Sequence, residues 1–199
     1  WLIKTDKNGK EEWSKAYGWV YNETGFSLVQ TVDDGYLLVG SKWNPILKKH
    51  NIWIVKVGPS GAQEWDRLVD ENYSGYGHKI VQSGDGLYTV AGVTKKLGND
   101  WYDLWMAQMD FSGNFVWEQI YTMSHIALNQ FYYVDIAPTN DGGIICVGPT
   151  DQYGLDMDAL LMKFDSYGNI EWNGMYGGKG QEIGLSVVQA KDGGFAFLG

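Results

Sequence analysis

The chain has 199 residues and a formal net charge of −9 at pH 7, and 44% of its residues are hydrophobic and 15% aromatic. This apolar content is sufficient for a folded core and excludes a disordered chain. The negative charge excludes nucleic acid as an expected partner, because phosphate binding requires a basic surface. No apolar stretch approaches the ~18 residues of a membrane-spanning helix, so no membrane span is expected.

The chain begins with a predicted hairpin over residues 1–17. Its turn is Asp6-Lys7-Asn8-Gly9, and glycine in the fourth place tolerates the positive φ that this place commonly requires. A tryptophan follows the turn glycine by four residues, and the same arrangement recurs three more times. The four tryptophans lie 52, 52 and 55 residues apart: Trp13, Trp65, Trp117 and Trp172. A period near fifty residues built from strands is typical of a propeller blade.

The copy that spans residues 80–121 shows the repeating unit most clearly. Strands are predicted over residues 80–82, 87–92, 104–109 and 115–121, because each is short and rich in Val, Ile, Leu, Tyr or Trp. Residues 93–103 are predicted to form a loop. Each copy has an Asp-Gly turn between its first two strands: Asp34-Gly35, Asp85-Gly86, Asp141-Gly142 and Asp192-Gly193. A glycine is expected to end the strand that follows each turn: Gly40, Gly92, Gly148 and Gly199.

These units predict an all-β fold. A sheet of four hairpin-linked strands cannot bury both of its faces alone, whereas radial stacking buries each sheet against the next. We therefore predict a β-propeller of four four-stranded antiparallel blades in a single domain over residues 1–199, with the four tryptophans between the blades. A stack of separate β-sandwiches is the rival arrangement, and the unit is too short to favour it.

Several motifs carry a family resemblance. Gln30-Thr31 precedes the first Asp-Gly turn, Trp53-Ile54-Val55-Lys56 lies in a later strand, and Tyr176-Gly177-Gly178 follows the last tryptophan. Together with Asp141-Gly142-Gly143, these motifs resemble the propeller repeats, about fifty residues long, of bacterial and archaeal surface and secreted proteins, and more loosely WD repeats. The resemblance covers the whole chain, although Gln108 replaces the repeat's lysine. These repeats contain no catalytic motif, so the resemblance implies no catalytic residue.

The resemblance implies a blade order A-B-C-D from the inner to the outer strand. On this order the chain begins with strands C and D over residues 1–17 and ends with strands A and B over residues 185–199. These two half-blades add up to a fourth blade, so they are expected to pair and close a four-bladed ring. The alternative is that the chain is part of a larger ring. Because it opens at Trp1 without methionine, we expect a processed or excised piece of a longer protein.

Side chains for catalysis or metal binding are sparse. The three histidines lie in different copies without metal-ligand spacing, and Cys146 lies in an apolar strand where a small buried residue is expected. We assign no catalytic residue and no cofactor. Asp156 and Asp158 are the weak candidates for a calcium site, but the spacing does not match a calcium loop, and bracing of the B–C loop is favoured over calcium.

Aromatic residues gather in the D–A and B–C loops, which emerge on the same face in this blade order. Rings beside carboxylates and amides suit a sugar or a peptide surface, although such rings also pack beneath their own loops. The candidate ligand-binding residues on this face are Trp19, Tyr21, Trp43, Tyr73, Tyr76, His78, Trp101, Tyr102, Tyr132 and Tyr153.

The sequence therefore favours a non-catalytic binding or scaffold module of an extracytoplasmic prokaryotic protein, on the cell surface or secreted. Its expected partner is a protein or a glycan on the aromatic face. Two alternatives stay open. One is a lectin or a carbohydrate-active enzyme that uses the same face, and the other is a structural unit that self-associates through unpaired strands.

Overall fold

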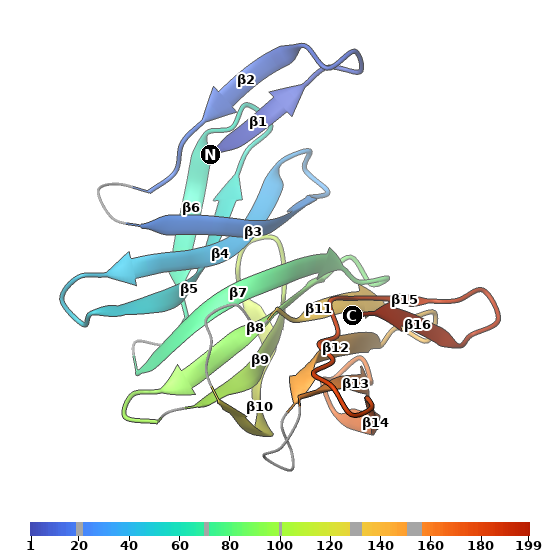
Figure 1. Ribbon diagram of the computed structural model, residues 1–199. Helices are drawn as coiled ribbons and strands as arrows, with labels where there is room; N and C mark the ends of the chain where they lie inside the picture. Colours follow the sequence, from blue (N-terminus) through green and yellow to red (C-terminus); the bar gives the residue numbers. More distant parts are fainter. Residues whose placement is uncertain (19–21, 70–71, 100, 128–132, 151–156) are drawn as a thin grey trace.

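The computed structural model describes residues 1–18, 22–69, 72–99, 101–127, 133–150 and 157–199. Within these ranges the chain forms antiparallel sheets and no helix, in agreement with the predicted all-β fold (Figure 1). Three sheets have four strands in sequence order, and two have a single hairpin each.

The three complete sheets are called blades 1 to 3. Blade 1 consists of β3 (Glu23–Gln30), β4 (Tyr36–Asn44), β5 (Lys49–Val57) and β6 (Gln63–Leu68). Blade 2 consists of β7 (Tyr73–Gln82), β8 (Tyr88–Lys96), β9 (Trp101–Met109) and β10 (Phe115–Ala127). Blade 3 consists of β11 (Asp135–Pro138), β12 (Ile144–Thr150), β13 (Asp158–Phe164) and β14 (Ile170–Tyr176).

The two hairpins are called the N-terminal and C-terminal half-blades. The first contains β1 (Leu2–Thr5) and β2 (Glu11–Lys15), and the second contains β15 (Ser186–Gln189) and β16 (Phe195–Leu198). They form two separate sheets at the two ends of an arc (Figure 1), so the expected fourth four-stranded blade and the closed ring are not formed. Each hairpin instead packs its apolar face against the blade next to it in sequence.

Successive sheets pack face to face along the arc. The first strands lie on its inside, where β7 contacts β3, β11 contacts β7, and β15 contacts β11. Buried apolar side chains fill each interface: Leu37 and Ile54 of blade 1 meet Tyr88 and Val90 of blade 2. A second cluster joins blades 2 and 3, and smaller clusters hold the half-blades.

The repeat tryptophans lie between the sheets, as expected, and the first three each cover the turn glycine of the next blade. Trp13 lies over Gly61, Trp65 over Gly113, and Trp117 over Gly168, so closely that an added Cβ on any of these glycines would fall 2.8–3.0 Å from the ring. Each of these glycines also has a positive φ. Trp13 and Trp117 donate their indole N–H to carbonyls of the same turns, at 3.1 Å.

The turn between the first two strands of a blade holds a buried lysine. In blade 1, Asp33 accepts hydrogen bonds from Thr31 and from the Gly35 N–H, and it pairs with Lys56 Nζ at 2.9 Å. These contacts, that of Thr31 foremost, lower the pKa of Asp33 to about 2. The aspartate equivalent to those of the other Asp-Gly turns is thus Asp33, and the predicted match of Asp34-Gly35 is wrong. Asp34 occupies the positive-φ position that glycine takes in the other copies.

The same ion pairs recur in blade 3, where Lys163 pairs with Asp141 and with Glu171 of β14, each at 2.9 Å. Blade 2 departs from the pattern at three places together. Gln108 replaces the lysine, Leu87 replaces the glycine after the turn, and Val116 replaces the outer glutamate. An added Cβ on Gly35 would lie 2.4 Å from Lys56 Nζ and 2.4 Å from the Val57 carbonyl oxygen, so the glycine leaves room for both the lysine and the backbone.

Strands β3 and β7 each contain a β-bulge, and the bulges explain the glycines of the facing strands. The register shifts between Gly25 and Ser27 and between Gly77 and Lys79. At the first bulge the Thr24 carbonyl approaches so closely that a Cβ on Gly40 would lie 1.8 Å from its oxygen. These glycines therefore lie within their strands and do not end them as predicted. β4 continues to Asn44, and β8 continues to Lys96 through part of the predicted loop.

Alanine at Gly40 is expected to destabilise the fold by about 3 kcal/mol or more, because its Cβ has no room against the backbone of β3. Gly25 on the paired strand is the matched control, because an added Cβ there meets nothing within 4 Å. Chemical denaturation of Gly40→Ala and Gly25→Ala measures the difference. Equal stability of the two variants would contradict the bulge.

Candidate functional site

A cavity of about 560 Å³ opens beside the inner strands of blades 1 and 2. Its walls come from the first residues of β3, the end of β4, the start of β5, β7 and the residue segment before β11. The lining residues are Asn22, Glu23, Thr24, Phe26, Ser41, His50, Tyr76, His78 and Tyr133. All of them lie near the D–A and B–C connections, the end of the blades that the sequence singled out. We call this the axial cavity.

The two bulges place an aromatic cluster in the axial cavity. Phe26 and His78 occupy the bulge positions of β3 and β7, and a bulge redirects the side chain of its extra residue. Their rings meet edge to face with centroids 5.5 Å apart. Tyr133 stacks on His78 at 4.9 Å and 17°, and its hydroxyl donates to the His78 carbonyl.

His78 is held neutral. Its side chain is 1% exposed, and burial lowers its pKa to about 4. The backbone N–H of Val134 donates to Nδ1 at 3.3 Å. Because Nδ1 accepts this bond, the proton of the neutral ring is assigned to Nε2. The imidazole therefore acts as a flat, uncharged ring at neutral pH.

A second row of rings continues from the cavity across blades 1 and 2. His50 lies between Trp43 and Tyr76, with centroids 5.0 and 4.9 Å away, and Tyr102 follows Tyr76 at 6.1 Å. Burial raises the pKa of Tyr76 to about 12 and lowers that of His50. His50 Nδ1 is buried and has no hydrogen-bond partner among the described residues.

The polar groups of the axial cavity are amide, hydroxyl and carboxylate. Asn22, Thr24 and Ser41 supply neutral donors and acceptors, and Glu23 is the single carboxylate among the described lining residues. The described lining contains no Lys or Arg. The cavity therefore presents neutral and weakly acidic surfaces beside flat rings.

The structure divides the ten predicted site residues. Tyr76 and His78 line the axial cavity, while Trp43 and Tyr102 belong to the row of rings behind it. Trp101 is 39% exposed at the start of β9, outside the lining. Four further predicted residues lie outside the described residues: Trp19, Tyr21, Tyr132 and Tyr153.

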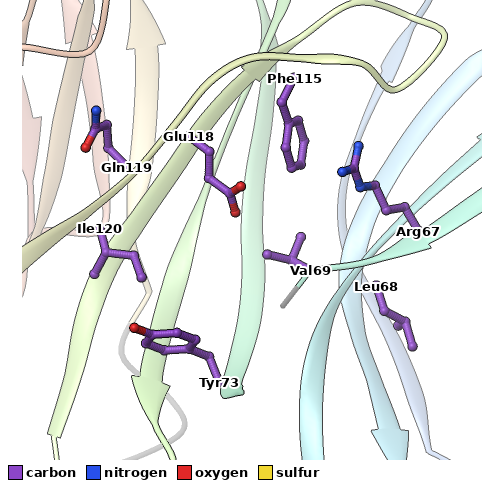
Figure 2. A pocket seen from close by; sticks show the side chains of 8 residues that line it. All are labelled: Arg67, Leu68, Val69, Tyr73, Phe115, Glu118, Gln119 and Ile120. Atoms are coloured by element: carbon purple, nitrogen blue, oxygen red, sulfur yellow. The ribbon is translucent and has the colours of Figure 1, made fainter. Parts of the chain in front are cut away.

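Tyr73 lies instead in a groove between the outer strands of blades 1 and 2, which we call the outer groove. Figure 2 shows Arg67 beside Phe115 in this groove and Glu118 between the two blades. The Arg67 guanidinium lies 4.0 Å from the Phe115 ring centroid and donates to the Gly113 carbonyl at 2.6 Å. Glu118 accepts the Trp105 indole N–H at 2.8 Å. Arg67 thus links blade 1 to blade 2, while Glu118 is bonded within blade 2. Both charged groups already have structural partners, so the axial cavity is the better candidate site.

Sequence reasoning missed Phe26, His50 and Tyr133, which line the axial cavity. Phe26 and His78 occupy the same position in successive copies, 52 residues apart, and that equivalence is a signal present in the sequence. The bulge that turns both side chains toward the cavity is not visible in the residue pattern.

The metal candidates and the cysteine lie away from the axial cavity or outside the described residues. Asp156 lies outside the described residues, and Asp158 is half-buried at the start of β13. The described part of the chain contains no group of three or more His, Cys, Asp or Glu side chains arranged for a metal ion. Cys146 is buried in β12, as expected, and burial raises the pKa of its thiol. No membrane-spanning helix is found among the described residues.

The chain is similar to a solved structure, the native Bacillus subtilis arabinanase Arb43A. The two share 13% identity and a TM-score of 0.47, over 76% of this chain and 54% of that one. No protein-family model and no curated protein matches the chain. The chain thus spans about half of the length of the arabinanase structure, and no property of that enzyme is carried over.

The depressed pKa of His78 predicts a pH-dependent stability. A histidine whose folded pKa is about 4, against 6.5 in the unfolded chain, loses stabilisation as the pH falls from about 6.5 to 4. We expect a loss of about 2 kcal/mol between pH 7 and pH 5.

The matched variant is His78→Phe, which places in β7 the residue that β3 carries at the same position. Its free energy of unfolding is expected to change much less between pH 7 and pH 5, as urea denaturation at the two pH values measures. An equally steep pH dependence in both proteins would show that His78 is not the responsible group.

Proposed function

We propose that the chain is a non-catalytic binding module and that the axial cavity takes a neutral carbohydrate chain. The observation that carries the proposal is the set of flat rings that two equivalent bulges direct into one cavity. Phe26 and Tyr133 are the partly exposed rings of this set, and the buried His78 supports both as a ring that is uncharged at neutral pH. Sugar CH faces pack on such rings, and hydroxyl groups reach the polar side chains around them.

The polar lining supports a neutral ligand. Asn22, Thr24 and Ser41 can exchange hydrogen bonds with hydroxyl groups. His50 Nδ1, which has no partner among the described residues, is a buried nitrogen at the cavity wall that can donate or accept a hydrogen bond. Without Lys or Arg among the described lining residues, an anionic ligand would find no counter-charge there. The volume of about 560 Å³ falls in the usual range of ligand cavities.

The number of carboxylates among the described residues of the cavity lining favours binding over hydrolysis. Glycoside hydrolysis generally uses two carboxyl groups that flank the scissile bond, about 5–10 Å apart. The described lining supplies one, Glu23. A peptide segment is the competing ligand, because its side chains also pack on aromatic rings, and the binding experiment distinguishes the two.

The test is the binding of a panel of neutral oligosaccharides, measured on an array and then by calorimetry. Phe26→Ala is expected to weaken the affinity about tenfold or more, because Phe26 is the most exposed ring of the cluster, at 38%. Phe111→Ala is the matched control, since Phe111 is 41% exposed in the turn between β9 and β10 and does not line the cavity.

Equal affinities of the two variants would contradict the axial site. Binding of peptides but of no oligosaccharide would contradict the carbohydrate ligand. Reducing ends released from a bound oligosaccharide, and lost in Glu23→Gln, would contradict the non-catalytic role.

A further inference from the structure

The junction between blades 1 and 2 has a valine where the junctions on either side of it have a tyrosine. The residue four places after the repeat tryptophan is Tyr17 before blade 1, Val69 between blades 1 and 2, and Tyr121 between blades 2 and 3. Val69 lines the outer groove. We propose that the outer groove binds a tyrosine side chain from an extended peptide segment of a partner protein, in the place of the ring that blade 1 does not supply.

The tyrosine has the same role at both neighbouring junctions. Tyr17 donates its hydroxyl to the Gly61 carbonyl at 2.8 Å, and Tyr121 donates to the Gly168 carbonyl. Each acceptor is the turn glycine of the following blade. The Tyr121 ring also packs on Phe164 of that blade, with centroids 4.9 Å apart. A phenol ring is thus the group that this part of a blade junction accommodates.

Val69 has the backbone position of the equivalent tyrosines and a shorter side chain. Its N–H donates to the Ile52 carbonyl at 3.0 Å, and Ile52 is equivalent to Leu104, which lies opposite Tyr121. Val69 is 8% exposed and belongs to the apolar cluster that joins blades 1 and 2. Because valine is shorter than tyrosine by a whole ring, space is left between the two blades beyond it.

Arg67 replaces the hydrogen bond of the tyrosine hydroxyl and leaves the groove open. Its guanidinium donates to the carbonyl of Gly113, the turn glycine equivalent to Gly61 and Gly168, and lies 4.0 Å from the Phe115 ring centroid. The outer groove still has a volume of about 510 Å³. A cavity of roughly 150 Å³ already holds a benzene molecule in another protein, so a phenol ring has room here.

The walls of the outer groove suit an aromatic side chain (Figure 2). Phe115 and Tyr73 supply rings, on which a third ring can pack edge to face or offset. Leu68 and Ile120 add apolar side chains that are 40% and 39% exposed. A bound ring removes these apolar surfaces from water and extends the cluster of which Val69 is already a member.

The polar groups of the groove favour tyrosine over an aliphatic or acidic side chain. Glu118 presents a carboxylate, which accepts hydrogen bonds and repels a second carboxylate. One of its oxygens accepts the Trp105 indole N–H at 2.8 Å, and the carboxylate can also accept from a phenol hydroxyl. Gln119 can exchange hydrogen bonds with the main chain of the peptide. The groove lies between two complete blades, so the proposal does not depend on either end of the chain (Figure 1).

The first test fills the outer groove from within. The double variant Arg67→Gln with Val69→Tyr gives blade 1 the residues that blade 2 has at the same places, Gln119 and Tyr121. Its denaturation midpoint in urea is expected to equal or exceed that of wild type, because the new ring enters existing space. The control is Val90→Tyr, which adds a ring where the same cluster is fully buried and is expected to lower the midpoint. A double variant as unstable as this control would overturn the proposal.

The second test is the binding of an alanine pentapeptide with tyrosine at its centre, blocked at both ends and measured by NMR titration. Wild type is expected to bind it at least about tenfold more tightly than the same peptide with leucine at the centre. The double variant is expected to lose this binding, because its own ring occupies the groove.

Phe26→Ala distinguishes the outer groove from the axial cavity, because Phe26 lines only the latter. This variant is expected to bind the tyrosine peptide as wild type does. A wild type that binds neither peptide, equal binding of the two peptides, binding that persists in the double variant, or binding lost in Phe26→Ala would each contradict the tyrosine site. Oligosaccharide binding that the double variant abolishes would assign the groove to a sugar and overturn the proposal as well.

Discussion

Face-to-face burial between successive sheets is the constraint on which the rest of this molecule depends. A four-stranded sheet of hairpins has two apolar faces, so no blade is stable without a neighbour on each side. The chain meets this requirement with a repeated contact, in which an indole ring lies on a glycine turn of the next blade. Only glycine allows this approach, because a Cβ there would collide with the ring.

Within each of blades 1 and 3, a buried lysine joins three strands. Lys56 draws the A–B turn and strand D toward the centre of the sheet, through Asp33 and Glu64. Blade 2 shows that the arrangement is a unit, because the lysine, the turn glycine and the outer glutamate are all replaced together. Its substitute is a neutral network in which Gln108 bonds Ser83, and Ser83 bonds Thr89. A buried charge is tolerated only when its partners of opposite charge are present. Blades 1 and 3 accordingly keep both the turn aspartate and the outer glutamate, whereas blade 2 replaces the lysine.

The axial cavity depends on irregularities within this regular frame. The bulges of β3 and β7 break the alternation of side chains and turn Phe26 and His78 inward. The cost is close backbone contact at Gly40 and Gly92, which is why both positions are glycine. In blades 1 and 2 the same bulge thus accounts for both a structural glycine and a ring of the candidate site.

The sequence by itself determined the all-β class, the period of the blades, the turn glycines and the place of the tryptophans. These features are local or strictly periodic, so spacing and residue type reveal them. It also indicated the end of the blades at which Tyr76 and His78 lie. Only the tertiary structure decided that Phe26, His50 and Tyr133 complete the cavity, that Tyr73 belongs to another groove, and that the half-blades form separate sheets. A bulge changes which way a side chain points without changing the residue pattern of the strand. The angle between packed sheets depends on contacts from many segments, so no single segment predicts it.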